Sequence, residues 1–261
     1  MKHTSVLRSL TGRGLLVLAL LLVFPGISFL SAESSDFTKV LQTIDRRSNF
    51  SDRDFTAKLR IVSDDPEKGT ETRVARTFRR DRQDSFVILF MEPADQLGQG
   101  YLRIDDNLWF YDPTSRKFTH SSMKENMQGT DAKNSDFRQS TLSVDYRVAS
   151  SAEGKLGAYD VWILDLEGRT NEVTYPYKKI YVTKKDSLLL KSEDYSLSKR
   201  LLRISYYPSY VKIGDTYIAD SLLFVDALVQ GKKTKITLTE VSIDPLPDSV
   251  FTKAYIERVN R

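Results

Sequence analysis

The chain has 261 residues, of which 40% are hydrophobic and 28% charged, and it contains no cysteine. The lack of cysteine excludes a disulfide framework, a thiolate metal site and a cysteine nucleophile. After residue 32 the chain holds 36 Lys and Arg against 35 Asp and Glu. This near balance argues against a broad nucleic-acid-binding surface, so we expect no nucleic-acid partner.

The N-terminus has the pattern of a secretory signal. An uninterrupted apolar run from Gly14 to Phe24 follows three basic residues, and small residues lead to Ala32. Cleavage after Ala32 would remove residues 1–32 as a signal peptide and release an exported protein. The alternative is an uncleaved inner-membrane anchor, because the stretch from Leu15 to Ala32 is almost long enough to span a bilayer.

Residues 33–261 are expected to form one domain, because no Gly/Ser-rich or Pro-rich stretch of linker length interrupts them. At the start of this domain, Phe37, Val40, Leu41 and Ile44 recur at helical spacing. They predict a short helix with one face on the core. Its N-terminus could be capped from the polar stretch 34–36.

Beyond this helix the hydrophobic period changes to two. The stretch Phe55–Ile61 alternates apolar and polar residues, and similar stretches separated by Gly, Pro, Asn or Asp recur to the C-terminal region. This pattern predicts a mainly β (α+β) fold, with about 10–12 strands in a strongly curved, incomplete antiparallel barrel. In the last strand the apolar phase shifts between Leu238 and Val241, which predicts a β-bulge.

Three segments are apolar on both faces of the strand: Phe86–Met91, Leu108–Tyr111 and Val161–Leu164. A strand of this kind in an antiparallel sheet must be covered both inside and outside the curve. Helices could supply the inner cover, and so could a hydrophobic ligand. The many Phe and Tyr residues would suit an apolar cavity, although aromatic residues on strands are also ordinary core residues.

The residues needed for common catalytic mechanisms are sparse. His120 is the only histidine after residue 32 and lies on an alternating strand, where a surface imidazole is the ordinary interpretation. No nucleophile elbow, Walker loop or dinucleotide-binding glycine motif occurs. The carboxylate pairs Asp64–Asp65 and Asp105–Asp106 fall at turns. We therefore expect no enzyme, no metal site and no cofactor, with an envelope hydrolase as a remote alternative.

Two segments resemble the LolA-like outer-membrane lipoprotein-sorting family. Ile104–Pro113 is similar to the strand-turn-strand in which that family has Trp and Tyr before Pro, and Ile243–Glu257 is similar to the family's ending. The wider set of matching residues is Phe90, Pro93, Gly98 or Gly100, Leu102, Trp109, Tyr111, Pro113, Lys117, Met127, Gly129, Thr130, Asp131 and, displaced, Phe137. The loop that follows Gly129 is longer here than the family's Gly-Ser-Asp-Phe pattern.

The resemblance implies a concave apolar face that holds acyl chains under an N-terminal helix and a short helical or loop lid. The implied cavity residues are Phe86, Ile88, Phe90, Leu102, Ile104, Leu108, Trp109, Phe110, Trp162 and Leu164. The implied lid residues are Phe37, Val40, Leu41, Ile44, Met123 and Met127. Arg80 is the candidate for holding the lid, although Asp81 stands where the LolA-type carriers have Pro.

The resemblance further implies a periplasmic carrier or chaperone that shields acyl chains of lipoproteins, or a phospholipid-like amphiphile, during outer-membrane sorting. Its expected partners are an inner-membrane transporter and an outer-membrane acceptor, and the expected state is a monomer. The alternative is an envelope protein-binding module that works beside an inner-membrane transporter. An exposed apolar patch on the convex face, rather than a cavity, would favour that alternative.

Overall fold

Strands dominate the computed structural model, which describes residues 37–214 and 216–259. The predicted signal peptide and the predicted capping residues Ser34, Ser35 and Asp36 lie outside the described residues. The strands are β1 (Phe55–Asp65), β2 (Gly69–Arg80), β3 (Ser85–Glu92), β4 (Gly100–Ile104), β5 (Asn107–Asp112), β6 (Lys117–Ser121), β7 (Tyr146–Leu156), β8 (Tyr159–Gly168), β9 (Tyr177–Thr183), β10 (Leu189–Tyr195), β11 (Leu201–Ile213), β12 (Thr216–Asp226) and β13 (Lys233–Ser242).

The helices are few and short. They are α1 (Phe37–Ser48), α2 (Leu142–Asp145) and α3 (Lys253–Val259), with single 3₁₀ turns η1 (Asp81–Gln83), η2 (Met127–Gly129), η3 (Asn134–Phe137) and η4 (Asp248–Phe251). Within the described residues, no helix is long and apolar enough to cross a membrane.

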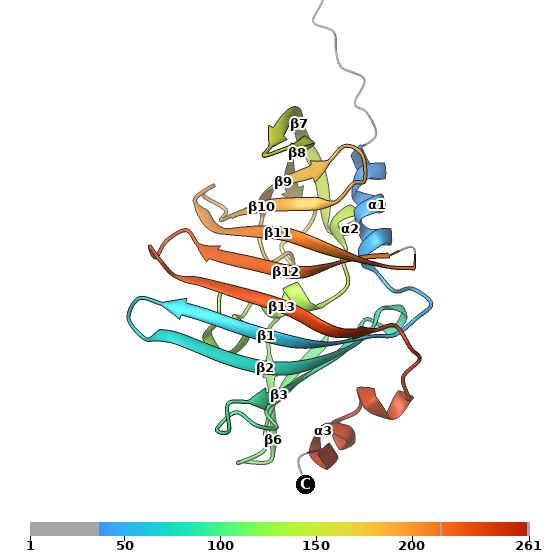
Figure 1. The fold of residues 1–261 in the computed structure, drawn as a ribbon, viewed down its shortest axis with the longest axis vertical. Coiled ribbons are helices and arrows are strands. Elements are labelled where there is room, and N and C mark those ends of the chain that lie inside the picture. Colours follow the sequence, from blue (N-terminus) through green and yellow to red (C-terminus); the bar gives the residue numbers. More distant parts are fainter. Residues whose placement is uncertain (1–36, 215, 260–261) are drawn as a thin grey trace, which may run out of the picture. The chain divides into compact units, whose positions relative to one another are not determined.

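All 13 strands form one antiparallel sheet in the order β6-β5-β4-β3-β2-β1-β13-β12-β11-β10-β9-β8-β7. Two meanders, β1–β6 and β7–β13, meet where β13 pairs with β1. Figure 1 shows the strands stacked in this order, with α1 beside the β7–β12 half and α3 beside the β1–β6 half. Because β6 and β7 are not paired with each other, the sheet is open, as the sequence predicted.

The sequence pattern explains several local features of the sheet. The helical stripe predicted from Phe37 becomes α1, with Leu41 and Ile44 buried. The predicted bulge in the last strand is confirmed, because the register of β13 against β1 shifts there and Glu240 has φ 50°. Asp105, with φ 52°, starts the turn that joins β4 to β5. Asn and Asp tolerate this left-handed conformation better than other non-glycine residues.

The convex face of β2–β6 is covered by the C-terminal segment. Val87, Leu102 and Tyr111 point outward and pack against Val250, Phe251 and Ile256 of η4 and α3 in one buried cluster. Burial of these side chains on the outside explains why β3 and β5 are apolar on both faces. The sequence predicted the double cover, and the outer cover is the chain's own C-terminus.

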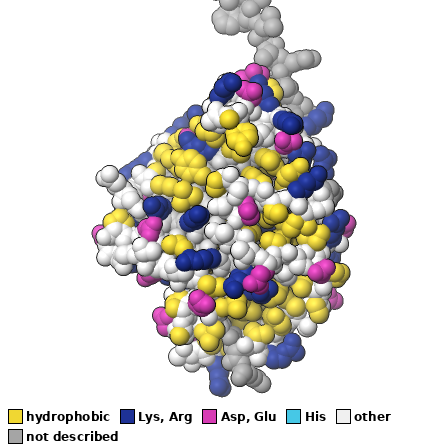
Figure 2. All heavy atoms as spheres, in the orientation of Figure 1, with side chains coloured by type: hydrophobic (Ala, Val, Ile, Leu, Met, Phe, Trp, Pro, Cys, Tyr) yellow, Lys and Arg dark blue, Asp and Glu magenta, His cyan; other side chains and the backbone are white. Residues whose placement is uncertain are grey.

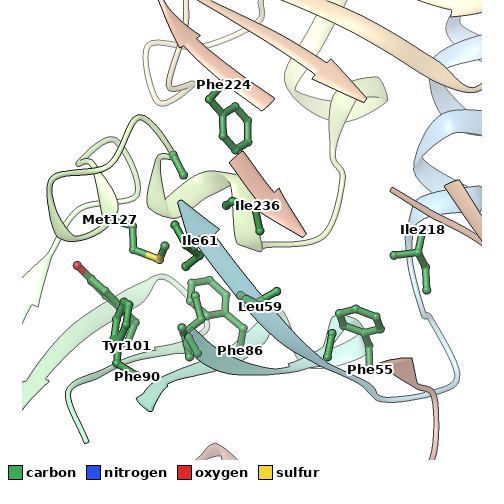
Figure 3. Packing of buried hydrophobic residues seen from close by; sticks show 14 of the residues in the cluster. Phe55, Leu59, Ile61, Phe86, Phe90, Tyr101, Met127, Ile218, Phe224 and Ile236 are labelled. Carbon is green, nitrogen blue, oxygen red and sulfur yellow. The ribbon is translucent and has the colours of Figure 1, made fainter. Parts of the chain in front are cut away.

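The concave face of β1–β5, β12 and β13 carries the largest buried cluster. Phe86 and Phe90 of β3 point inward there, with Phe224 of β12 and Ile236 of β13 (Figure 3). Ile88 of β3 belongs to the same cluster. The link from β6 to β7, residues 122–145, runs across this face, and we call it the crossing segment. Its Met127 and Ala132 are fully buried in the same cluster. A third cluster lies under α1, where Leu41 and Ile44 pack on β7, β8 and β9.

Candidate functional site

A cavity of about 380 Å³ lies between the concave face and its cover of α1 and the crossing segment. Its sheet side comes from β1, β2 and β9–β13, and its roof from the end of α1, residues 135–145 and the loop between β8 and β9. Apolar lining residues include Ile44, Phe50, Phe55, Leu59, Val173, Ile180, Leu189, Ile218, Leu222, Phe224, Ile236 and Leu238, and polar ones include Arg47, Arg79, Asp136, Arg138, Ser140, Tyr175, Lys178, Ser192, Arg203, Tyr207, Tyr210 and Tyr217.

The ten residues predicted for an acyl-chain cavity are distributed among the three packed clusters. Phe86, Ile88, Phe90, Leu108 and Phe110 pack in the inner cluster, Leu102, Ile104 and Trp109 in the outer one, and Trp162 and Leu164 under α1. None of the ten is among the residues that line the cavity. Their acyl-chain role stays a prediction, and the cavity supplies a different set of candidates.

The predicted lid residues do lie on the cover of the concave face. Phe37, Val40, Leu41 and Ile44 pack from α1 onto the cluster beneath it, and Phe37 makes an edge-to-face contact with Trp162 at 5.3 Å. Met123 and Met127 of the crossing segment pack on the inner cluster. Ile44 and Met123 also line the cavity. The structure thus brings these residues to the roof, while their movement stays a prediction.

Polar contacts join the two parts of the roof, beside the packing of Leu142 on the cluster under α1. The carboxylate of Asp45 in α1 accepts hydrogen bonds from the Ser140 hydroxyl at 2.5 Å and from the backbone N–H groups of Leu142 and Ser143 at 2.9 and 2.8 Å. Asp45 therefore caps the first turn of α2 from another helix. Asn49 adds a reciprocal pair with the Ser140 backbone at 2.8 and 2.7 Å. We call these contacts the Asp45 latch.

Arg79, not Arg80, contacts the lid helix. The Arg79 guanidinium donates to the Ser48 carbonyl at the end of α1 at 2.8 Å and lies over the rings of Phe50 and Phe55. It also pairs with Asp81 at 2.6 Å and lines the cavity. The lid contact that the resemblance assigned to Arg80 is thus made by its neighbour.

The partners of Arg80 lie elsewhere, because successive side chains of a strand point to opposite faces. Arg80 is buried and donates to both carboxylate oxygens of Asp54 at 2.9 Å, to Asp248 at 2.5 Å and to the Leu246 carbonyl at 2.5 Å. Its guanidinium lies 4.6 Å from the centre of the Phe251 ring. Arg80 therefore holds the C-terminal outer cover.

A buried charged network forms one wall of the cavity. Arg203 donates to Asp194 at 2.9 Å and binds Asp136 of the crossing segment with two nitrogens at 2.6 and 3.0 Å. Lys178 donates to Asp194 at 2.5 Å. Burial raises the pKa of Asp194, but Lys178 and Arg203 outweigh it and hold that pKa below its usual range. The network therefore stays ionised and ties the crossing segment to β9, β10 and β11.

Tyrosines surround this network. Lys178 lies over the rings of Tyr146 and Tyr175, and Arg203 lies over Tyr175 and Phe224. Burial raises the pKa of the Tyr146 and Tyr175 hydroxyls. Both hydroxyls therefore stay protonated and can donate hydrogen bonds at neutral pH.

The groups considered for catalysis do not converge on this cavity. His120 is exposed on the edge strand β6, beside Trp109. Asp64 and Asp65 belong to the hairpin of β1 and β2. Among the described residues, no cluster of three or more His, Asp or Glu could hold a metal ion.

Sequence reasoning missed Lys178, Asp194 and Arg203. Lys178 and Asp194 lie on strands in which charged residues also occupy the outward positions, such as Lys179 and Glu193, and Arg203 stands between Leu202 and Ile204, where alternation favours an outward arginine. Alternation separates two faces but does not tell which one is inside when both carry charges. Only the pairing of β9, β10 and β11 brings the three residues together.

Comparison with known proteins agrees with this architecture. A family model described as "Uncharacterized protein" matches residues 82–258. No curated protein matches the chain.

Several solved structures share the fold. A LolA superfamily protein from Nitrosomonas europaea is 23% identical, with TM-score 0.72, over 83% of this chain and 97% of that one. A protein domain from Vibrio parahaemolyticus described as outer membrane lipoprotein-sorting is 19% identical, with TM-score 0.76, over 85% and 98%. A DUF1329 family protein from Desulfovibrio piger is 21% identical, with TM-score 0.75, over 84% and 97%. The chain therefore belongs to the family whose model spans residues 82–258, and its fold is the LolA-like fold that its sequence motifs predicted.

Proposed function

We propose that the protein is a periplasmic carrier that shields the acyl chain of a lipoprotein or another lipid in the cavity, without covalent catalysis. The observation that carries the proposal is the cavity itself, which lies between the concave sheet face, with its aromatic and aliphatic side chains, and a roof that polar contacts help to hold. The lipoprotein-sorting description of the structure from Vibrio parahaemolyticus supports the same class of cargo. The apolar run in residues 14–24 supports export.

The size of the cavity limits what the closed form can hold. At about 30 Å³ for a methylene, similar to the share of one water molecule in the liquid, 380 Å³ accommodates about a dozen methylenes. Their transfer from water is worth about 0.8 kcal/mol each, or about 10 kcal/mol before the costs of association. The closed cavity therefore suits one acyl chain, and cargo with several chains requires the roof to move.

The surface gives less support to the alternative of a protein-binding module. Most of the strongly exposed large apolar side chains among the described residues lie in turns or at element ends, for example Leu97, Leu197, Leu228 and Val259. On the face drawn in Figure 2, Lys, Arg, Asp and Glu side chains are scattered among the apolar ones. Partners in the inner and outer membranes, and the monomeric state, stay predictions.

Native mass spectrometry of the mature protein from an envelope fraction, followed by lipid extraction, tests the proposal. We expect acyl-containing species to co-purify, and Leu222→Asp, which places a charge on the cavity wall, should abolish them. Leu197→Asp is the matched control, because Leu197 is 75% exposed in the turn between β10 and β11. Equal lipid content in the two variants, or a lipid-free mass that added lipids leave unchanged, would contradict the carrier function.

A further inference from the structure

The cavity has two chemically different walls. Leu59 of β1, Leu222 of β12 and Leu238 of β13 belong to an apolar wall, which is suited to contact with an acyl chain. Lys178 of β9 and Arg203 of β11 belong to a polar wall, together with Tyr175 from the loop before β9. In the strand order β1-β13-β12-β11-β10-β9, the apolar wall lies on the first three strands, and Lys178 and Arg203 lie on the last three, together with the apolar Ile180 and Leu189.

The cations of the polar wall are already neutralised. Arg203 is shared between Asp136 and Asp194, and Lys178 pairs with Asp194 as well. Two cations therefore face two carboxylates within hydrogen-bond distance. A phosphate that entered this wall would have to displace a carboxylate or be buried next to one, and both are costly in a low-dielectric interior.

The other basic residues of the cavity also have partners. Arg79 pairs with Asp81 at 2.6 Å, and Arg138 lies 3.7 Å from Asp84, which Arg103 binds at 2.5 Å. Arg47 donates to the Asp186 carbonyl and lies over the Tyr217 ring, contacts that satisfy its donors without cancelling its charge. The wall formed by Lys178 and Arg203 is therefore the part of the cavity that offers little uncompensated positive charge to an anionic head group.

Hydrogen-bond donors do remain on the polar wall. An ammonium group has three N–H donors, and Asp194 takes one of those of Lys178. Tyr175 also lines the cavity, and its hydroxyl is a further donor there. Donors without excess charge match a carbonyl oxygen, which accepts hydrogen bonds and carries no net charge.

We propose that Lys178 and Tyr175 donate hydrogen bonds to the ester or amide carbonyl of the cargo's acyl group, and that the cavity therefore prefers an uncharged acylglycerol-type head to one that carries a phosphate. This inference rests on the proposed carrier function and specifies its cargo. The acyl chain then lies along the apolar wall, and the carbonyl sits where the chain meets the polar wall. A phospholipid would share the carbonyls but add a phosphate that the neutralised wall does not favour.

Three ligands with equal chains separate the contribution of the carbonyl to binding from that of the phosphate. We would measure dissociation constants of the mature protein for 1-decanoylglycerol, for its ether analogue 1-decylglycerol, which lacks the carbonyl, and for the corresponding one-chain decanoyl phosphatidic acid. The ester should bind about tenfold more tightly than the ether, in line with one or two buried hydrogen bonds. Phosphatidic acid should bind at least tenfold more weakly than the ester.

Tyr175→Phe should lower the ratio of ether to ester dissociation constants about five- to tenfold and leave the ether constant unchanged. The matched control is Tyr181→Phe, because Tyr181 lies on the same strand as Lys178 but donates to Glu193 instead of lining the cavity. Equal binding of ester and ether, or tightest binding of phosphatidic acid, would overturn the carbonyl preference while leaving the carrier function intact. If none of the three ligands binds, the carrier function itself fails.

Discussion

Removal of the Asp45 carboxylate should open the roof of the cavity. This carboxylate is 9% exposed and accepts three hydrogen bonds of 2.5 to 2.9 Å from the crossing segment. Loss of a helix cap costs about 0.5–2 kcal/mol, and hydrogen bonds to a charged group are stronger than neutral ones. We therefore expect Asp45→Ala to stabilise the open roof relative to the closed one by about 2 kcal/mol, which is roughly a 30-fold larger open population.

Hydrogen exchange measures this opening directly. The amides of Leu142 and Ser143 donate to Asp45, so they should exchange about 30-fold faster in the variant if the roof opens as a unit. Dissociation of a bound fluorescent fatty acid should accelerate by a similar factor. Asp52→Ala is the control, because the Asp52 side chain is 84% exposed and 3.9 Å from Arg53. If the Leu142 amide exchanges at the wild-type rate in Asp45→Ala, the latch does not control the roof.

Two further predictions concern the Arg79–Arg80 pair and pH. Arg80→Met should lower the free energy of unfolding in urea by about 3–5 kcal/mol, because it leaves Asp54 buried without its main partner. Arg79→Met should lower the free energy of unfolding less and should instead speed fatty-acid release. If Arg79→Met lowered the free energy of unfolding more than Arg80→Met, the assignment of the two side chains to opposite faces would be contradicted. Burial raises the pKa of Asp54, but hydrogen bonds from Arg80, Leu246 and Arg82 outweigh it and lower that pKa from 3.8 to about 2. The resulting stabilisation, about 2 kcal/mol, is fully present above pH 4 and is lost as pH falls through 2. Urea unfolding at pH 5 and pH 2 should show this loss in the wild type and not in Asp54→Asn.

Most of the sheet could be predicted from alternation because its strands bury one face and expose the other. Alternation does not predict the first strand of the second meander, β7, and the reason is physical. It is an edge strand, and from Arg147 to Lys155 most of its side chains are exposed. A strand that buries almost nothing has no apolar period to detect.

The candidate site was less accessible to sequence reasoning. The segments with the most apolar residues, such as Phe86–Met91, are apolar because protein fills the space on both faces. The cavity borders β1, β2 and β9–β13, and on β9 and β11 its lining includes Lys178, Arg203 and Tyr207 at inward positions. A high density of apolar residues in the sequence therefore marks the packed part of such a sheet. Part of the space for cargo lies beside polar residues that face inward, and no local sequence pattern distinguishes these from polar residues on the surface.

The two covers of the sheet differ in how they are held, and this difference bears on release of cargo. The outer cover packs Val250, Phe251 and Ile256 onto the strands and is clamped by the buried Arg80. The roof also buries apolar side chains, such as Leu41 and Met127, but the Asp45 latch and the Arg203–Asp136 contact that help to hold it are polar and replaceable by water once the roof lifts. Binding of an acyl chain, worth about 10 kcal/mol in transfer free energy, exceeds the roughly 2 kcal/mol of the latch, so the latch by itself does not prevent loading. Release then needs an acceptor that binds the chain at least as well, because the latch is too weak to expel it.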